Sequence, residues 1–174
     1  MNRRERSFPE NTQRLLRLPL LMLLLIFFTT VTVLPGCSTR PAGEDLTLNV
    51  EECADTLRET IAFQDTLTAI SAEMIAAIYQ IPTANVVQQQ VYVSTGATAE
   101  EIAVFEAVDN EAAQEIETAA RERLANQITG FEDYLPAELP KLKDPFIAVK
   151  GKYVIVCVSN HNEDVKKVWD TFLK

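Results

Sequence analysis

A single apolar segment near the start of the chain constrains the protein more than any other feature. It runs from Leu18 to Cys37, and every side chain from Leu20 to Phe28 is apolar. Residues 1–17 carry five arginines against two glutamates, and the segment ends at a Pro35–Gly36 break. A positive start, a short apolar stretch and an ending of small residues are the three parts of a secretory signal peptide. A membrane-spanning helix needs about 20 apolar residues, whereas Leu20 to Leu34 supplies fifteen, three of them threonines.

The end of this segment, Leu34-Pro35-Gly36-Cys37, resembles a bacterial lipobox, although Pro35 replaces the small or aliphatic residue usual at that place. The resemblance implies that the Cys37 thiol receives a diacylglyceryl group and that cleavage directly before it makes Cys37 the new N-terminus. Two acyl chains suffice for stable membrane anchoring. We therefore expect a lipoprotein on the extracytoplasmic face of the cell membrane, held there through Cys37. The alternative is a cysteine that follows a hydrophobic segment by chance.

The chain is thus expected to divide into three parts. Residues 1–36 form the lipoprotein signal peptide, residues 37–45 a lipidated tether, and residues 46–174 one acidic domain. The polar stretch from Ser38 to Asp45 has a composition typical of a linker. An extended chain spans at most about 3.6 Å per residue, so this tether keeps the domain within about 30 Å of the membrane.

The charge of the processed protein limits its partners. Once residues 1–36 are removed, 11 basic and 23 acidic residues remain, a net charge of −12. Nucleic-acid binding requires clustered lysines and arginines, and we do not expect it here. The charge favours neutral or basic partners in the envelope, although it can equally serve only to keep the domain soluble.

Hydrophobic periodicity predicts an α+β domain, with a small antiparallel sheet of about four strands packed with about four helices. Asn49 and Ser71 are predicted to cap two helices, which we expect to form a helical hairpin. A later helix should span residues 110–129 and stop at Gly130. Four strands are predicted: at 85–94, in the segment that follows the Thr98 turn, at 146–149 and at 153–158. Residues 131–145 are expected to form an irregular crossing segment. A last helix should be capped by Asn160 or Asn162 and reach Leu173.

Cys53 and Cys157 remain once Cys37 is acylated. Cys53 falls on the apolar face of the first predicted helix and Cys157 lies within an apolar strand. An extracytoplasmic location permits a disulfide, yet both positions also suit small buried thiols, and we favour burial.

Chemistry-bearing residues are few. His161 lies in Ser159-Asn160-His161-Asn162 at a strand-to-helix junction, where a turn or cap role is favoured over catalysis. Glu100 and Glu101 are adjacent, so on a strand they point to opposite faces, and capping the Thr98 turn is favoured over paired-carboxylate catalysis. The acids of Asn162-Glu163-Asp164 suit a helix start better than a calcium site. No catalytic, cofactor-binding or metal-binding residue is predicted, and the only predicted modification is lipidation of Cys37.

Three stretches in the expected domain support a family resemblance. These are Ala99-Glu100-Glu101-Ile102-Ala103-Val104-Phe105, Phe131-Glu132-Asp133-Tyr134-Leu135-Pro136 and Lys150-Gly151-Lys152-Tyr153-Val154. With them, Leu46 to Phe172 resembles the bacterial lipoprotein family of domain of unknown function 4358. The resemblance agrees with the lipoprotein prediction and implies no reaction, ligand or catalytic residue.

Two functions remain open from the sequence. The favoured one is a non-catalytic binding or structural module of the cell envelope, with the membrane and an unknown envelope protein or polymer as partners and no cofactor. The alternative is an envelope hydrolase whose carboxylates and hydroxyls come from distant segments.

Overall fold

The computed structural model describes residues 46–174. The predicted signal peptide, the tether and Cys37 lie outside the described residues. Five α-helices, five strands and two short 3-10 turns follow one another along the described chain. In order they are α2 (Val50–Thr60), β1 (Thr68–Ala69), α3 (Ala72–Tyr79), η1 (Thr83–Asn85), β2 (Val86–Val93), β3 (Glu101–Ala107), α4 (Asn110–Tyr134), η2 (Pro136–Glu138), α5 (Leu139–Lys143), β4 (Phe146–Lys150), β5 (Tyr153–Val158) and α6 (Asn162–Phe172).

The strands form one antiparallel sheet in the order β1-β2-β3-β5-β4. The α+β class predicted from the sequence is therefore confirmed, with one strand more than expected because the two-residue β1 has no sequence signal of its own. In the centre, β3 and β5 pair over six residues, from Glu101 opposite Val158 to Glu106 opposite Tyr153. Every residue of β5 is buried, as expected for a strand covered on both faces.

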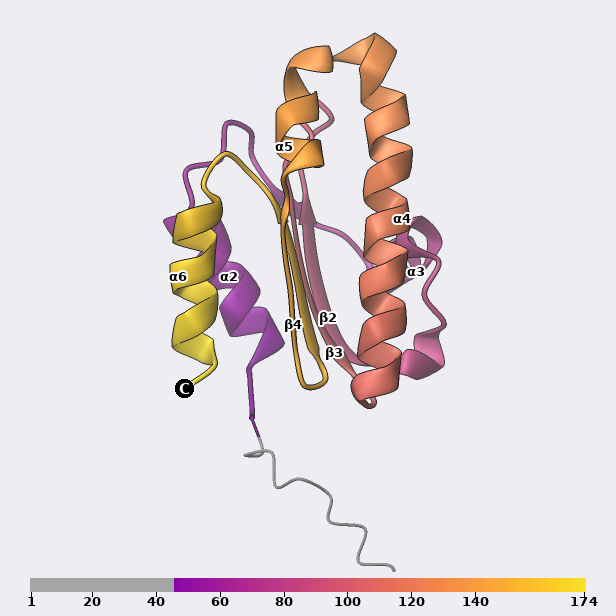
Figure 1. Cartoon of the computed structure of the whole chain (residues 1–174), viewed down its shortest axis with the longest axis vertical. Coiled ribbons are helices and arrows are strands. Elements are labelled where there is room, and N and C mark those ends of the chain that lie inside the picture. Colours follow the sequence, from indigo (N-terminus) through magenta and orange to yellow (C-terminus); the bar gives the residue numbers. More distant parts are fainter. Residues whose placement is uncertain (1–45) are drawn as a thin grey trace, which may run out of the picture. The chain divides into compact units, whose positions relative to one another are not determined.

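Helices cover both faces of the sheet, so the domain has three layers (Figure 1). One hydrophobic core lies between the sheet and α3, α4 and α5, with Phe105, Ile116 and Leu142 among its buried members. The other lies between the opposite face and helices α2 and α6, and contains Leu57 and Trp169. Alternation along β3 explains the division, because successive side chains of a strand point to opposite faces.

The predicted helix caps at the start of the domain are confirmed. The Asn49 side chain accepts a hydrogen bond from the Glu52 amide at 3.1 Å, and the Ser71 hydroxyl accepts one from the Met74 amide at 3.3 Å. The predicted helical hairpin is wrong, because β1 intervenes and the two helices pack in different cores. Periodicity identifies an apolar face but not the layer against which that face packs.

The predicted stop of α4 at Gly130 is also wrong. The helix continues to Tyr134, and Phe131 packs against the core between α4 and the sheet. A glycine inside a helix costs only about 1 kcal/mol relative to alanine, which a packed aromatic side chain outweighs. The segment that we expected to be irregular, 131–145, instead holds the end of α4, η2 and α5.

At the C-terminal end the strands predicted at 146–149 and 153–158 are confirmed, and they form a hairpin with Lys150 paired to Tyr153 across the turn. Trp169 of α6 is 3% exposed and belongs to the core on that side of the sheet. Neither Asn160 nor Asn162 caps α6. His161 occupies the N-cap position without a side-chain hydrogen bond, and Asn162 is the first helical residue.

Cys53 and Cys157 are buried and free, in agreement with the favoured prediction. Burial raises the pKa of each thiol to about 12. Within residues 46–174, no helix is both long enough and apolar enough to cross a bilayer.

Candidate functional site

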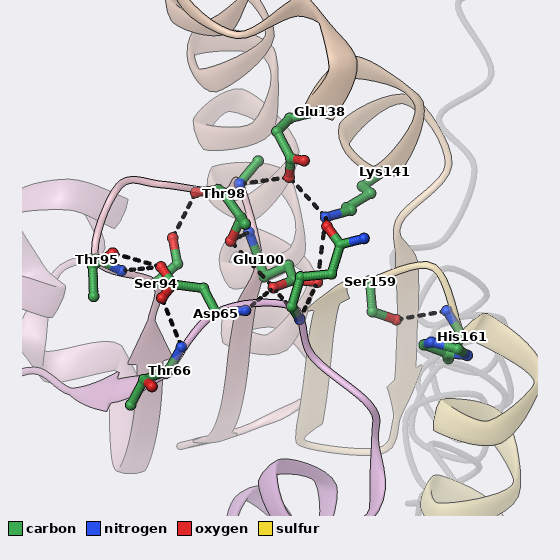
Figure 2. Close-up of polar contacts among 12 residues, drawn as sticks. Asp65, Thr66, Ser94, Thr95, Thr98, Glu100, Glu138, Lys141, Ser159 and His161 are labelled. Carbon is green, nitrogen blue, oxygen red and sulfur yellow. Dashed lines mark hydrogen bonds and ion pairs between the residues drawn. The ribbon is translucent and has the colours of Figure 1, made fainter.

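A buried ionic cluster lies where β3 begins and α5 passes over the end of the sheet (Figure 2). Its cation is Lys141, which is 4% exposed, and its anions are Glu100 and Glu138, which are 2% and 6% exposed. The Lys141 ammonium lies 2.8 Å from Glu138 Oε2 and 3.3 Å from Glu100 Oε1, and donates to Gln64 Oε1 at 2.7 Å. An ammonium has three N–H donors, so these three oxygens satisfy it completely.

The carboxylates of this cluster also accept backbone hydrogen bonds. Glu100 takes the amides of Gln64 and Asp65 at 2.9 and 3.0 Å, and Glu138 takes the amide of Ala99 at 2.9 Å. Two carboxylates facing one ammonium leave an excess of negative charge, and three amide dipoles stabilise it. The cluster therefore joins the α2–β1 loop, the start of β3 and α5 into one unit.

Asp65 extends this unit to the β2–β3 loop. Its carboxylate accepts the Thr95 hydroxyl at 2.6 Å, the Thr95 amide at 2.8 Å and the Thr66 amide at 2.7 Å. The hydrogen bonds from Thr95, first from its hydroxyl and then from its amide, lower the pKa of Asp65 below its ordinary value of 3.8. Figure 2 shows these contacts beside those of Glu100.

A second ion pair lies on the opposite face of β3. Arg123 of α4 forms two hydrogen bonds to Glu101, at 2.9 and 2.5 Å, and the Tyr79 hydroxyl donates to the same carboxylate. The Arg123 guanidinium also lies 5.1 Å from the centre of the Tyr79 ring. Burial, followed by the charge of Glu101, raises the pKa of Tyr79 well above its ordinary value of 10. This pair fastens α3 and α4 to the start of the sheet.

The sequence-based interpretation of Glu100 and Glu101 is therefore correct in one respect and wrong in another. They do point in different directions, and Glu100 does contact the Thr98 hydroxyl at 3.2 Å. Capping the Thr98 turn is not their main role, because each is 2% exposed and paired with a cation from a helix. The missed partner is Lys141, whose segment was expected to be irregular. The only sequence signal for it is the i,i+3 spacing from Glu138.

Next to the ionic cluster is a surface hollow of about 500 Å³ that includes Lys141, Asp144, Ser159 and His161 in its lining. The Ser159 hydroxyl accepts the main-chain amide of His161 at 3.0 Å. Within residues 46–174, no hydrogen bond joins that hydroxyl to the His161 ring. The Asn162 side chain donates to the Asp144 carbonyl at 2.6 Å, and Asp164 pairs with Lys167 at 2.8 Å. These side chains organise the β5–α6 turn and the first turn of α6.

Another hollow, of about 700 Å³, lies away from both ion pairs, between the chain entering α2 and the middle of β2. Its charged lining includes Glu106 and Lys152, which form an ion pair at 2.5 Å. Its polar lining also comes from three consecutive glutamines of β2, Gln88, Gln89 and Gln90.

Comparison with known protein families identifies the domain. The family model described as Domain of unknown function (DUF4358) matches residues 59–159. The chain belongs to the DUF4358 family. This confirms the family resemblance inferred from the sequence. No curated protein and no solved structure matches the chain.

The DUF4358 match contains the buried cluster but not every residue considered for chemistry. Gln64, Glu100, Glu138 and Lys141 all lie inside it, and so does the Glu101–Arg123 pair. His161 and α6 follow its last matched residue, and Cys37 precedes its first. The DUF4358 match thus covers the sheet with its buried charges and carries no information about the anchor.

Proposed function

We propose that this protein is a lipoprotein anchored through Cys37 on the extracytoplasmic face of a bacterial cell membrane. Its DUF4358 domain would be a non-catalytic binding or structural module of the cell envelope. The anchor rests on the arginine-rich start, the short apolar segment and the Leu34–Cys37 sequence, all of which precede the family match. The partners proposed are the membrane, through the lipid on Cys37, and an envelope protein or polymer.

The observation that carries the non-catalytic proposal is the way Lys141 is paired. A buried lysine beside a surface hollow is a candidate for chemistry, but all three donors of this ammonium are bound to oxygens of the fold. Releasing Lys141 to a substrate would leave two buried carboxylates without their cation, which is costly. These charged residues are therefore better explained as stabilising the fold than as catalysing a reaction.

The acidity of the domain supports the choice of partner. A net charge of −12 after processing disfavours nucleic acid and anionic lipid surfaces. A neutral or basic envelope component would meet no such repulsion.

Fractionation of cells that produce the full chain tests the anchor. The wild-type protein should sediment with membranes, incorporate labelled fatty acid and be digested by protease added to intact spheroplasts. Cys37→Ser should incorporate no label. Label in Cys37→Ser, or a wild-type protein protected from protease and free of label, would exclude the proposal.

The hydrolase alternative makes a separate prediction at the Ser159 hollow. A serine hydrolase should react with a fluorophosphonate probe, and Ser159→Ala should abolish that reaction. Under the non-catalytic proposal, the purified full chain reacts no faster than its Ser159→Ala variant. A Ser159-dependent adduct would replace the proposed function with the hydrolase.

A further inference from the structure

Strand β4 forms one edge of the sheet, and no other strand of residues 46–174 pairs with its outer side. In Figure 1 it lies between the helix layers, with α2 and α6 on one side and α4 on the other. Its five residues, Phe146–Lys150, pair with β5 without interruption. An edge of this kind offers a row of main-chain donors and acceptors to another strand.

The register of the hairpin tells which groups face outward. Lys150 and Tyr153 flank the two-residue turn Gly151–Lys152, so they form the hydrogen-bonded pair that closes it. Bonding alternates along an antiparallel pair, so Phe146, Ala148 and Lys150 direct their main-chain groups toward β5. The N–H and C=O groups of Ile147 and Val149 consequently point away from the sheet.

The interior of this strand, from Phe146 to Val149, has no proline, bulge or charge to protect the edge. Natural edges carry prolines, bulges or inward-pointing charges, whereas β4 has the sequence Phe-Ile-Ala-Val-Lys and its only charge is at its end. The first three of its side chains are half-buried and Val149 is 36% exposed, so part of their apolar surface lies open.

The other edge of the sheet is different. There β1 pairs with Val93 and Tyr92 of β2, and the amide of Ile70, the next residue, donates to the Val91 carbonyl. The uncovered part of β2 is irregular between Val86 and Gln88. Bulges of this kind disrupt strand addition. The regular edge available for pairing is therefore β4.

We propose that β4 pairs with β4 of a second copy of this chain, antiparallel and about a two-fold axis through Ile147, so that one sheet continues through both subunits. In this register Ile147 faces Ile147 of the second copy and Val149 faces its Pro145. The outward N–H groups of Ile147 and Val149 then meet the carbonyls of Ile147 and Pro145 across the axis. Proline has no N–H to contribute, so four main-chain hydrogen bonds form.

Although the domain as a whole is acidic, the opposite charges at the two ends of β4 favour a second copy as the occupant. The same register puts Lys150 of each subunit opposite Asp144 of the other, on the face covered by α6. Both residues are exposed in the single chain, and Asp144 precedes the strand by two residues. The positive charge at one end of the edge therefore meets the negative charge at the other end of the second copy, as an isologous two-fold interface requires. The contact does not depend on the lipid anchor.

Sedimentation equilibrium of the purified full chain in mild detergent tests the proposal. The wild type should show a concentration-dependent monomer–dimer equilibrium. Val149→Pro removes an outward N–H that β5 does not use, a substitution that edge strands tolerate, and should raise the dimer dissociation constant at least about tenfold. The matched variant Val149→Thr keeps the N–H and should dimerise within about threefold of wild type. Thermal unfolding verifies that both variants remain folded.

A charge exchange provides a second test that does not alter the backbone. Lys150→Glu creates two like-charge contacts and should weaken the dimer by about tenfold. Adding Asp144→Lys to Lys150→Glu should restore the affinity. A chain that stays monomeric at every concentration, as it would if another segment of the same chain covered β4, overturns the proposal. So does a dimer that neither Val149→Pro nor the charge exchange affects.

Discussion

Among single residues, Lys141 has the most demanding environment. It is a buried cation that donates to two carboxylates and an amide oxygen, and its three N–H groups are all bound only while these oxygens are in place. Removing one partner of a buried ion pair costs about 3–5 kcal/mol, because the remaining charge is left uncompensated. The contribution of the cluster to stability can therefore be measured by substituting one of its members.

We predict that Lys141→Met lowers the free energy of unfolding of the full chain by about 3–5 kcal/mol, measured by urea denaturation. Lys143→Met, an exposed change in the same helix, should alter it by less than about 0.5 kcal/mol. Adding Glu138→Gln to Lys141→Met should recover part of the loss, because one unpaired carboxylate disappears. Equal stability of the two lysine variants would contradict a structural role for the cluster.

Asp65 gives the domain a specific response to acid. Its pKa is lower in the folded chain than its ordinary value of 3.8 because Thr95 donates to the ionised form. Folding therefore gains stability from Asp65 above that ordinary value and loses it as pH falls through the lower folded value. The melting temperature of wild type should exceed that of Asp65→Asn between pH 5 and 7, and the difference should shrink below about pH 4. A difference in melting temperature between the two proteins that does not change with pH would contradict this assignment.

The buried thiols give a further prediction for individual side chains. Cys53 and Cys157 each have a pKa of about 12, and the thiolate is the reactive form. At pH 8 neither should be alkylated by iodoacetamide in the folded chain, whereas both should react in denaturant. Mass spectrometry after short exposure counts the modified sites, and rapid native alkylation of either thiol would contradict their burial.

At the scale of elements, two glycines illustrate opposite constraints. Gly130 lies inside α4 with helical backbone, and a Cβ there would meet no atom within 4 Å. Gly151 occupies the β4–β5 turn with φ at 58°, a conformation that other residues adopt only with strain. Gly130→Ala should therefore stabilise the domain by about 0.5–1 kcal/mol. Gly151→Ala should destabilise it by about 1 kcal/mol. Thermal denaturation followed by circular dichroism separates the two, and a loss of stability in Gly130→Ala would contradict the continuous helix.

The sequence predicted those elements that depend on residues close together in the chain. The Asn49 and Ser71 caps and the two strands of the β4–β5 hairpin all follow from spacings of a few residues. Contacts between distant segments were not predictable in this way. Glu100 meets Lys141 41 residues along the chain, and α2 and α3 separate to opposite faces of the sheet. Phe131 shows the same limit, because its packing carries α4 through a glycine that would otherwise end it.

For the whole molecule, the structure and the sequence account for different parts of the proposed function. The DUF4358 domain places its buried ions at the end of a sheet, where they join the α2–β1 loop and the start of β3 to helices α3, α4 and α5. The anchor is proposed from residues that precede this domain. An acidic domain on a short tether would face its partners close to the bilayer surface, where neutral or basic envelope components meet the least repulsion.

The mass of the intact protein from the membrane fraction tests the central proposal most directly. A lipoprotein processed at Cys37 has the mass of residues 37–174 plus acyl chains and glycerol, and its first fragment ion carries that lipid. Cys37→Ser should retain residues 1–36 and carry no lipid. A wild-type chain that retains residues 1–36 without added lipid mass would contradict the account.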